Sequence, residues 1–309
     1  MGGTRTTGRL RKWRPRRQTT SPRAASTRAR WLLTAVLPVL IWSSAVIAAD
    51  TAREILDRQK RLDDTERHWN DRYQRLKMHI VLAGGKTLER ELDVYERRYA
   101  NDEQKAIVFL RAPAEIKGTA LLAFTHRAKA AEQWLYLPAY KRAREISPDA
   151  RNERFVSSDL TYNDIDILTE LPTWSESDAT SRLRGEETLD GTPCYVIERA
   201  PTRAGVAYER IVVWLGRDDL VARQLEFYSR AAPSGWLNGL AGGSGSDEPS
   251  KRIRQHDIRT VGAIPVAYRV DVENVETGGT TTIDLTDVQF NQNLPDDLFT
   301  QRALERGGK

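Results

Sequence analysis

From Tyr73 onward, apolar and polar residues alternate with a period of two along most of the chain. Such alternation is typical of strands with one buried face. The first two alternating segments, 72–82 and 88–99, flank Gly84-Gly85 and predict a long hairpin. The others lie at 104–113, 117–126, 132–146, 181–201, 208–229 and 251–291. With their short turns, these segments predict a mainly β protein of about eleven antiparallel strands in one meander that curls toward a barrel.

Three segments depart from the alternation. Residues 51–69 are polar, but Ile55, Leu56, Gln59 and Leu62 share one helical face, which predicts an amphipathic N-terminal helix. Residues 147–174 are rich in Asp, Ser and Asn and predict a short capped helix. Residues 231–250 are rich in Gly and Ser and predict a flexible insertion, with an apolar flap carrying Trp236 as the alternative.

The segment 132–146 is unusual among the predicted strands because neither of its faces is polar from Trp134 to Tyr140. Aromatic residues and proline occupy one set of alternate positions and aliphatic residues the other, as the sequence WLYLPAY (134–140) shows. Both faces must therefore be covered. Either both belong to the core, or one of them lines a cavity.

The charge of the chain is divided unevenly. Residues 1–49 hold ten Lys or Arg and no acidic residue, which leaves 38 basic and 43 acidic residues, a net charge of −5, in 50–309. This balance does not favour a nucleic-acid surface. Arg28 and Arg30, the apolar run 31–49 and its small-residue end predict a signal peptide over 1–49. An uncleaved anchor is the alternative, because 19 residues approach the ~20 that span a bilayer.

Residues with catalytic potential are scattered. The four histidines, His68, His79, His126 and His256, show no metal-ligand spacing, and no nucleophile or nucleotide motif is present. Cys194 is the single cysteine and is predicted to be buried. Asp159, Asp164 and Asp166 form the densest acidic cluster; it could hold a cation or a basic partner, or serve capping and solvation. We therefore expect no enzyme and no cofactor or metal.

Four segments together resemble the outer-membrane lipoprotein-sorting (LolA-like) family of exported bacterial proteins. They are EIKGTALLAF (115–124), QWLYLPAYKRAREI (133–146), RFVSSDLTYNDI (154–165) and LPDDLFTQRALER (294–306). The similarity runs from about Ile55 to Arg306. It implies an unclosed antiparallel β-barrel with helices across its opening and an apolar cavity for acyl chains. The insertion 231–250 is not part of that pattern.

The resemblance leads to a specific hypothesis for residues 50–309. They would form a periplasmic carrier that binds acyl chains of lipids or lipoproteins and passes them between membrane partners, among them an inner-membrane lipid exporter. The candidate lipid-lining residues are Leu122, Phe124, Trp134, Tyr136, Trp214 and Phe227. The candidate partner-binding residues are Lys141, Arg142, Arg144 and Asp159. The first alternative is an accessory module that docks on a membrane transporter without lipid, and the second is a hydrolase.

Overall fold

The computed structural model describes residues 51–126, 131–230 and 248–307. The predicted signal peptide and most of the predicted insertion 231–250 lie outside these ranges. The α-helices of the described residues are α1 (Ala52–Asp64), α2 (Tyr162–Glu170) and α3 (Gln301–Arg306). None of the described helices is both long and apolar enough to cross a membrane.

Strands make up most of the described chain. They are β1 (Asp71–Val81), β2 (Thr87–Arg98), β3 (Gln104–Ala112), β4 (Ala120–Thr125), β5 (Glu132–Leu137), β6 (Arg142–Glu145), β7 (Ala179–Leu189), β8 (Thr192–Pro201), β9 (Tyr208–Gly216), β10 (Ala222–Ser229), β11 (Lys251–Val261), β12 (Ile264–Asn274) and β13 (Gly279–Phe290).

All thirteen described strands join one antiparallel sheet, in the order β6-β5-β4-β3-β2-β1-β13-β12-β11-β10-β9-β8-β7. The sheet is not closed, because β6 and β7 each have one neighbour. The predicted fold class is therefore confirmed. One element was predicted wrongly. The segment 132–146 is not a single strand but the hairpin of β5 and β6, which turns at Pro138–Lys141.

Short turns and caps explain most of the local structure. Asp190-Gly191 joins β7 to β8 with φ angles of 49° and 80°, the left-handed conformation that a two-residue hairpin turn needs and that Asp-Gly adopts readily. Thr51 and Glu54 cap α1 reciprocally, and Thr161 and Asp164 do the same for α2. Each capping box satisfies backbone N–H groups that the first helical turn leaves without partners.

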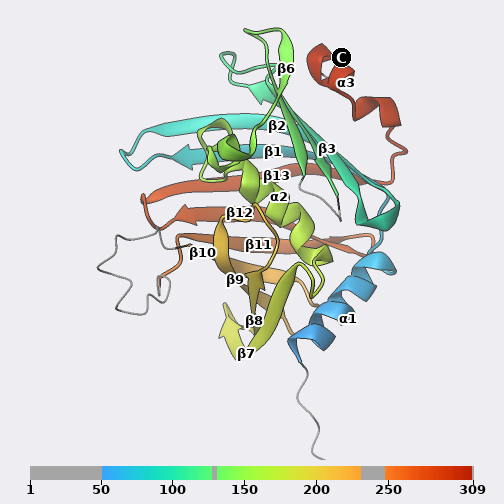
Figure 1. Cartoon of the computed structure of the whole chain (residues 1–309), viewed down its shortest axis with the longest axis vertical. Coiled ribbons are helices and arrows are strands. Elements are labelled where there is room, and N and C mark those ends of the chain that lie inside the picture. The colour runs from blue at the N-terminus through green and yellow to red at the C-terminus, as the bar shows by residue number, and fades with distance from the viewer. Residues whose placement is uncertain (1–50, 127–130, 231–247, 308–309) are drawn as a thin grey trace, which may run out of the picture. The chain divides into compact units, whose positions relative to one another are not determined.

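One pairing in the sheet is far from local. β1 pairs with β13 over ten residue pairs, so the first and last strands lie in the middle of the sheet. Both edges therefore come from the middle of the sequence. The chain passes from edge β6 to edge β7 through residues 146–178, which we call the bridging segment and which contain α2. In Figure 1, α2 crosses in front of the middle of the sheet, with β6–β1 on one side of it and β11–β7 on the other.

The bridging segment covers one face of the sheet, which we call the inner face. Two clusters of apolar side chains lie between them, one on each half of the sheet. Phe155 and Tyr162 pack on the half with β1–β4, against Met78, Ile80 and Leu121. Ile167, Leu171 and Trp174 pack on the other half, with Ile211, Val213, Leu225 and Phe227 among their partners. α1 covers β8 and β9 on the same face through Ile55. The inner face is thus an apolar core beneath helices.

The opposite, outer face is covered in part by the C-terminal segment. Phe299, Ala303 and Leu304 pack on Ile107, Phe109, Ala120 and Leu122. Thr300 caps α3 by accepting a hydrogen bond from the amide of Ala303. Glu305 also accepts a hydrogen bond, at 3.1 Å, from the backbone N–H of Ala143 on edge strand β6. Of the stretch WLYLPAY, Trp134 and Tyr136 therefore lie on the side of the C-terminal segment and Leu135 on the side of the bridging segment, whereas residues 138–140 form the turn and are exposed, contrary to the expectation that the whole stretch is covered.

Candidate functional site

The β5–β6 hairpin separates its two kinds of side chain between the two faces. Trp134 and Tyr136 point to the outer face, where Phe124 lies edge-on to Trp134 with ring centroids 5.0 Å apart. Leu135 points to the inner face and packs with the bridging segment. In the ladder, Leu135 pairs with Arg144 and Leu137 with Arg142. Antiparallel partners share a face, so both arginines stand beside the two leucines.

A pocket of about 340 Å³ lies where this hairpin meets the start of the bridging segment. Its apolar lining comes from Leu135, Leu137, Ile146, Ala150 and Tyr162, the first residue of α2. Arg142, Arg144, Glu145, Ser147 and Glu153 provide most of its polar lining. The pocket is therefore an apolar recess with a charged rim.

The rim is accessible and carries charges of both signs, with Arg142 and Arg144 beside Glu145 and Glu153, and the basic residues continue along the hairpin. Lys141, Arg142 and Arg144 are all exposed. Tyr140 is 60 % exposed, and the Arg144 guanidinium lies 4.8 Å from the centre of its ring. Such an arrangement combines positive charge with an apolar surface, which suits an anionic amphiphile.

Buried carboxylates hold the bridging segment to the sheet. Asp159 accepts a hydrogen bond from Thr281 on β13 at 2.9 Å and pairs with Arg154 at 2.9 Å. Asp164 pairs with Lys251 on β11 and accepts a hydrogen bond from the hydroxyl of Tyr208 at 2.5 Å. The strand partners all belong to β13, β11 and β9, so these polar contacts fix the segment to the half of the sheet that follows it in the chain.

A third carboxylate of α2 faces β5. Asp166 accepts a hydrogen bond at 2.7 Å from Gln133, a fully buried residue whose own Oε1 has no partner within the described structure. Burial and the nearby Glu170 raise the pKa of Asp166 to about 7, against the pull of Arg151 and Arg203. Burial also raises the pKa of Glu170. α2 therefore carries two buried acids whose ionised forms are disfavoured.

The predicted site residues fall into separate places. Four of the lipid-lining candidates, Leu122, Phe124, Trp134 and Tyr136, form the outer-face platform beneath the C-terminal segment. Trp214 also faces outward and donates a hydrogen bond to Glu187 at 2.8 Å. Phe227 lies in the inner core beside Tyr208. None of the six lines the pocket.

The partner-binding candidates divide as well. Lys141, Arg142 and Arg144 lie together on the hairpin, whereas Asp159 is 1 % exposed and bonded within the protein. Leu135, Leu137 and Ala150 were missing from the prediction. They form the aliphatic positions of the double-faced segment and the first turn after it. The pairing of Leu135 with Arg144 and of Leu137 with Arg142 could have identified the pocket. It is visible in the sequence only if 132–146 is recognised as a hairpin.

The other candidates for chemistry remain dispersed. The acidic cluster is neither solvated nor a shared site, because its three carboxylates bond to different partners; the predicted capping role holds for Asp164. Cys194 is buried, as predicted. Within the described ranges, no group of three or more His, Cys, Asp and Glu side chains is placed to hold a metal ion.

Known structures share this fold. A domain from Vibrio parahaemolyticus assigned to outer membrane lipoprotein sorting is 23% identical, with a TM-score of 0.71, over 82% of this chain and 98% of that one. A DUF1329 family protein from Desulfovibrio piger is 26% identical, with a TM-score of 0.71, over 82% and 99%. A LolA superfamily protein from Nitrosomonas europaea is 18% identical, with a TM-score of 0.60, over 82% and 100%.

Sequence comparisons gave two results. No curated protein sequence matches this chain significantly. A family described as an uncharacterized protein matches residues 102–233 and 243–306, more than half of the chain and all of the bridging segment. The chain therefore belongs to that family, and its fold is LolA-like.

Proposed function

We propose that this protein is an exported carrier that binds acyl chains of a lipid or lipoprotein and passes them between membrane partners. The observation that carries the proposal is the pocket between the β5–β6 hairpin and the bridging segment, with leucines inside and arginines at the rim. An acyl chain would contact Leu135, Leu137 and Ile146. Its anionic head group would lie near Arg142 and Arg144.

The size of the pocket is sufficient for useful affinity. A volume of about 340 Å³ holds roughly ten methylene-sized groups, if each takes about the 30 Å³ of a liquid water. At about 0.8 kcal/mol per buried CH₂ this gives roughly 8 kcal/mol before ordering costs, as an upper bound for a pocket open on one side. The dissociation constant would therefore be about micromolar at its tightest.

Movement of the bridging segment would enlarge the site. Beneath the segment, the inner face of β1–β4 continues the apolar floor of the pocket through Leu121 and Met78. A longer chain would enter there if Phe155 and Tyr162 withdrew. The ligand would stabilise the open form because it replaces their apolar contacts.

The first alternative rests on the same rim. Lys141, Arg142 and Arg144 would then dock on an acidic surface of a membrane transporter, and an inner-membrane lipid exporter is one such partner. Uptake of lipid separates the two functions, since docking alone needs no acyl chain in the pocket.

A pocket-filling variant tests the proposal. Ala150→Trp places an indole in the pocket and should abolish uptake of a fluorescent fatty acid. Ala207→Trp is the matched control, because Ala207 lines a different, polar hollow. Mass spectrometry of gently purified wild type should also recover bound lipid. If both variants take up the probe as wild type does, or if wild type takes up none, the carrier proposal fails.

Export is a separate part of the proposal. Cleavage after Ala49 would leave α1 complete, because its capping box uses Thr51 and Glu54. N-terminal sequencing of protein from the periplasm should find a chain that begins near Asp50. Recovery from the membrane with residues 31–49 intact would instead support the uncleaved anchor.

A further inference from the structure

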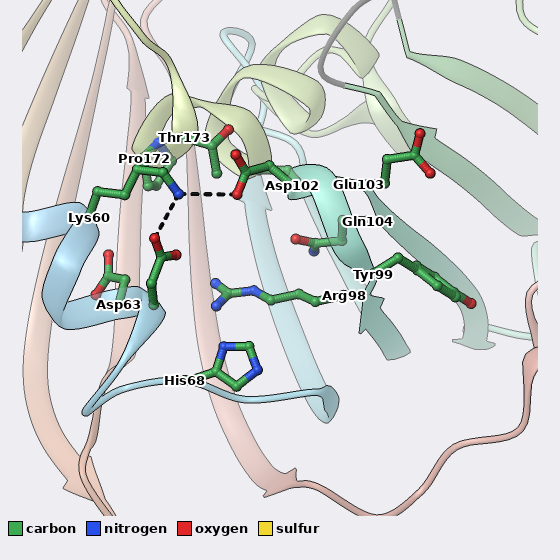
Figure 2. A pocket seen from close by; sticks show the side chains of 12 residues that line it. Lys60, Asp63, His68, Arg98, Tyr99, Asp102, Glu103, Gln104, Pro172 and Thr173 are labelled. Carbon is green, nitrogen blue, oxygen red and sulfur yellow. Dashed lines mark hydrogen bonds and ion pairs between the residues drawn. The ribbon is translucent and has the colours of Figure 1, made fainter. Parts of the chain in front are cut away.

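A second pocket, of about 100 Å³, lies where α1 ends, at the other end of α2 from the acyl pocket. Its lining comes from the end of α1, the end of β2, the start of β3 and the residues after α2 (Figure 2). The polar residues that matter below are Lys60, Asp63, Asp64, His68, Arg98 and Asp102. Figure 2 shows Arg98 reaching into the middle of the pocket, with His68 on one side and Lys60 and Asp63 facing it.

Arg98 is a half-buried cation without a bonded partner. Its guanidinium lies 3.9 Å from the centre of the Trp69 ring. Within the described structure, the guanidinium donates no hydrogen bond and lies in no ion pair, whereas the backbone N–H of Arg98 donates to the carbonyl of Asn70 at 2.8 Å. Arg72 provides the contrast: it contacts the same ring at 4.8 Å but is paired with Glu96 at 2.5 Å. Burial and the nearby Arg72 lower the pKa of Arg98, although the carboxylates of Glu96, Asp63 and Asp64 act in the opposite direction.

The opposite wall of the pocket is acidic. Lys60 pairs with Asp64 at 2.9 Å and with Asp102 at 3.1 Å, so one ammonium serves two carboxylates. Asp63 is 3.9 Å from its nearest cation, Arg67. A simple anion would meet Arg98 favourably but these carboxylates unfavourably. A simple cation would be attracted by the carboxylates and repelled by Arg98.

We propose that this pocket binds a small zwitterion, with its phosphate or carboxylate on Arg98 and its ammonium on the carboxylate wall of Asp63. The planar fork of a guanidinium suits two oxygens of one oxyanion, and stacking on Trp69 holds the fork in place. His68 borders the same side and can add one further donor. On the scale of about 30 Å³ per heavy-atom group, a volume of about 100 Å³ encloses only part of such a ligand, whether this is a free zwitterion or the tip of a lipid head group.

This inference does not depend on acyl-chain binding, since it concerns other residues at the other end of α2. The two sources of the zwitterion differ in where the protein binds. A free solute binds in solution, whereas a phosphoethanolamine head group also draws the protein to vesicles that contain it. The first probe is therefore O-phosphoethanolamine, and the second is a pair of vesicle preparations, phosphatidylethanolamine and phosphatidylcholine.

Calorimetric titration of the full chain tests the site. O-phosphoethanolamine should bind more tightly than inorganic phosphate, ethanolamine or O-phosphocholine, whose methylated ammonium donates no hydrogen bond. Arg98→Gln should weaken binding by at least about ten-fold, the loss expected for charge-assisted hydrogen bonds. Arg72→Gln, which removes the paired arginine from the same ring, should change it little.

Stability separates a binding role from a structural one. Arg98→Gln should unfold at nearly the same urea concentration as wild type, because the loss of stacking on Trp69 is offset in part by removal of a charge that burial disfavours. Equal binding by Arg98→Gln and wild type, equal weakening by both variants, or absence of binding to every probe would overturn the proposal. Binding of the solute with no preference between the vesicles would identify a free zwitterion, and a preference for phosphatidylethanolamine a head group.

Discussion

Lys251 of β11 and Asp164 of α2 form an ion pair in which both side chains are buried. The hydroxyl of Tyr208 donates a further hydrogen bond to Asp164. Together with the hydrogen bond from Thr281 to Asp159 and the pair of Glu170 with Arg203, this contact holds the bridging segment to the part of the chain that follows it. Its loss should therefore affect more than local packing.

Removing one member of this pair should be strongly destabilising. Lys251→Met leaves the Asp164 carboxylate buried without its cation, and we expect a loss of about 3–5 kcal/mol in the free energy of unfolding. The exposed pair Lys77–Glu91 is the control, since Lys77→Met should cost no more than about 1 kcal/mol. Urea titrations measure both. A loss for Lys251→Met as small as that of Lys77→Met would contradict the assigned role.

The approach of Gly279 to Asp159 gives a second prediction. A Cβ at Gly279 would lie 2.6 Å from Asp159 Oδ1, and Asp159 is held by Arg154 and Thr281. Gly279→Ala should therefore destabilise the protein by about 1–3 kcal/mol through overpacking. Gly84→Ala is the control, because a Cβ there meets nothing within 4 Å. Thermal melts that rank the two variants equally would show that Asp159 yields at no cost.

The buried acid Asp166 predicts how stability changes with pH. Its pKa is about 7 in the folded protein and near 3.8 when unfolded, so the folded state binds more protons between these values. This contribution to stability is complete below about pH 4 and is lost as the pH rises to 7, by at most about 1.4 kcal/mol per unit. Asp166→Asn should flatten that slope and be more stable than wild type at pH 8.

The comparison for Asp166 is an acid that faces solvent. Asp57→Asn, at an exposed position of α1, should leave the pH dependence of unfolding as in wild type. Denaturant titrations at pH 4, 6 and 8 give the slopes. Parallel curves for Asp166→Asn and wild type would mean that Asp166 does not titrate in this range.

The two faces of β5 should respond differently to substitution. Trp134→Ala removes an aromatic from the platform beneath the C-terminal segment and should destabilise toward the lower end of about 3–5 kcal/mol, because the side chain is only partly buried. It should leave fatty-acid uptake unchanged. Leu137→Gln, on the pocket side, should reduce uptake with a smaller loss of stability. Reduced uptake in Trp134→Ala at full folding would place the acyl chain on the outer face.

Much of the fold could be predicted because period-two alternation reports which strand face is buried. The hairpin of β5 and β6 was missed because the alternation runs through its turn, so that Pro138 and Tyr140 continue the pattern of Trp134 and Tyr136. The pairing of β1 with β13 could not be predicted from the sequence for another reason. It joins residues about two hundred positions apart, from Val81–Thr280 to Arg72–Phe290, and no local signal specifies it.

The candidate site was predicted less well than the fold. Size and aromatic character identified Trp134, Tyr136 and Phe124 as candidate lipid-lining residues. These properties do not reveal which segment of the chain packs against their face of the sheet. From the sequence alone, capping and solvation explain Asp164 and Asp166 adequately, because Asp is common at helix starts. Their burial depends on Lys251 and Gln133, which come from distant strands. Polar partners of this kind follow from tertiary structure alone.

The central position of the β1–β13 ladder makes this a molecule of two complementary halves. β1–β6 come from the chain before the bridging segment, and β7–β13 from the chain after it. Ten residue pairs of one ladder join the two sets of strands, independently of the segment. A proteolytic nick between Ser147 and Ser177 would thus yield two fragments that remain associated, and separately produced fragments would be expected to reassemble. Covalent continuity is needed to cover the inner face, not to build the sheet.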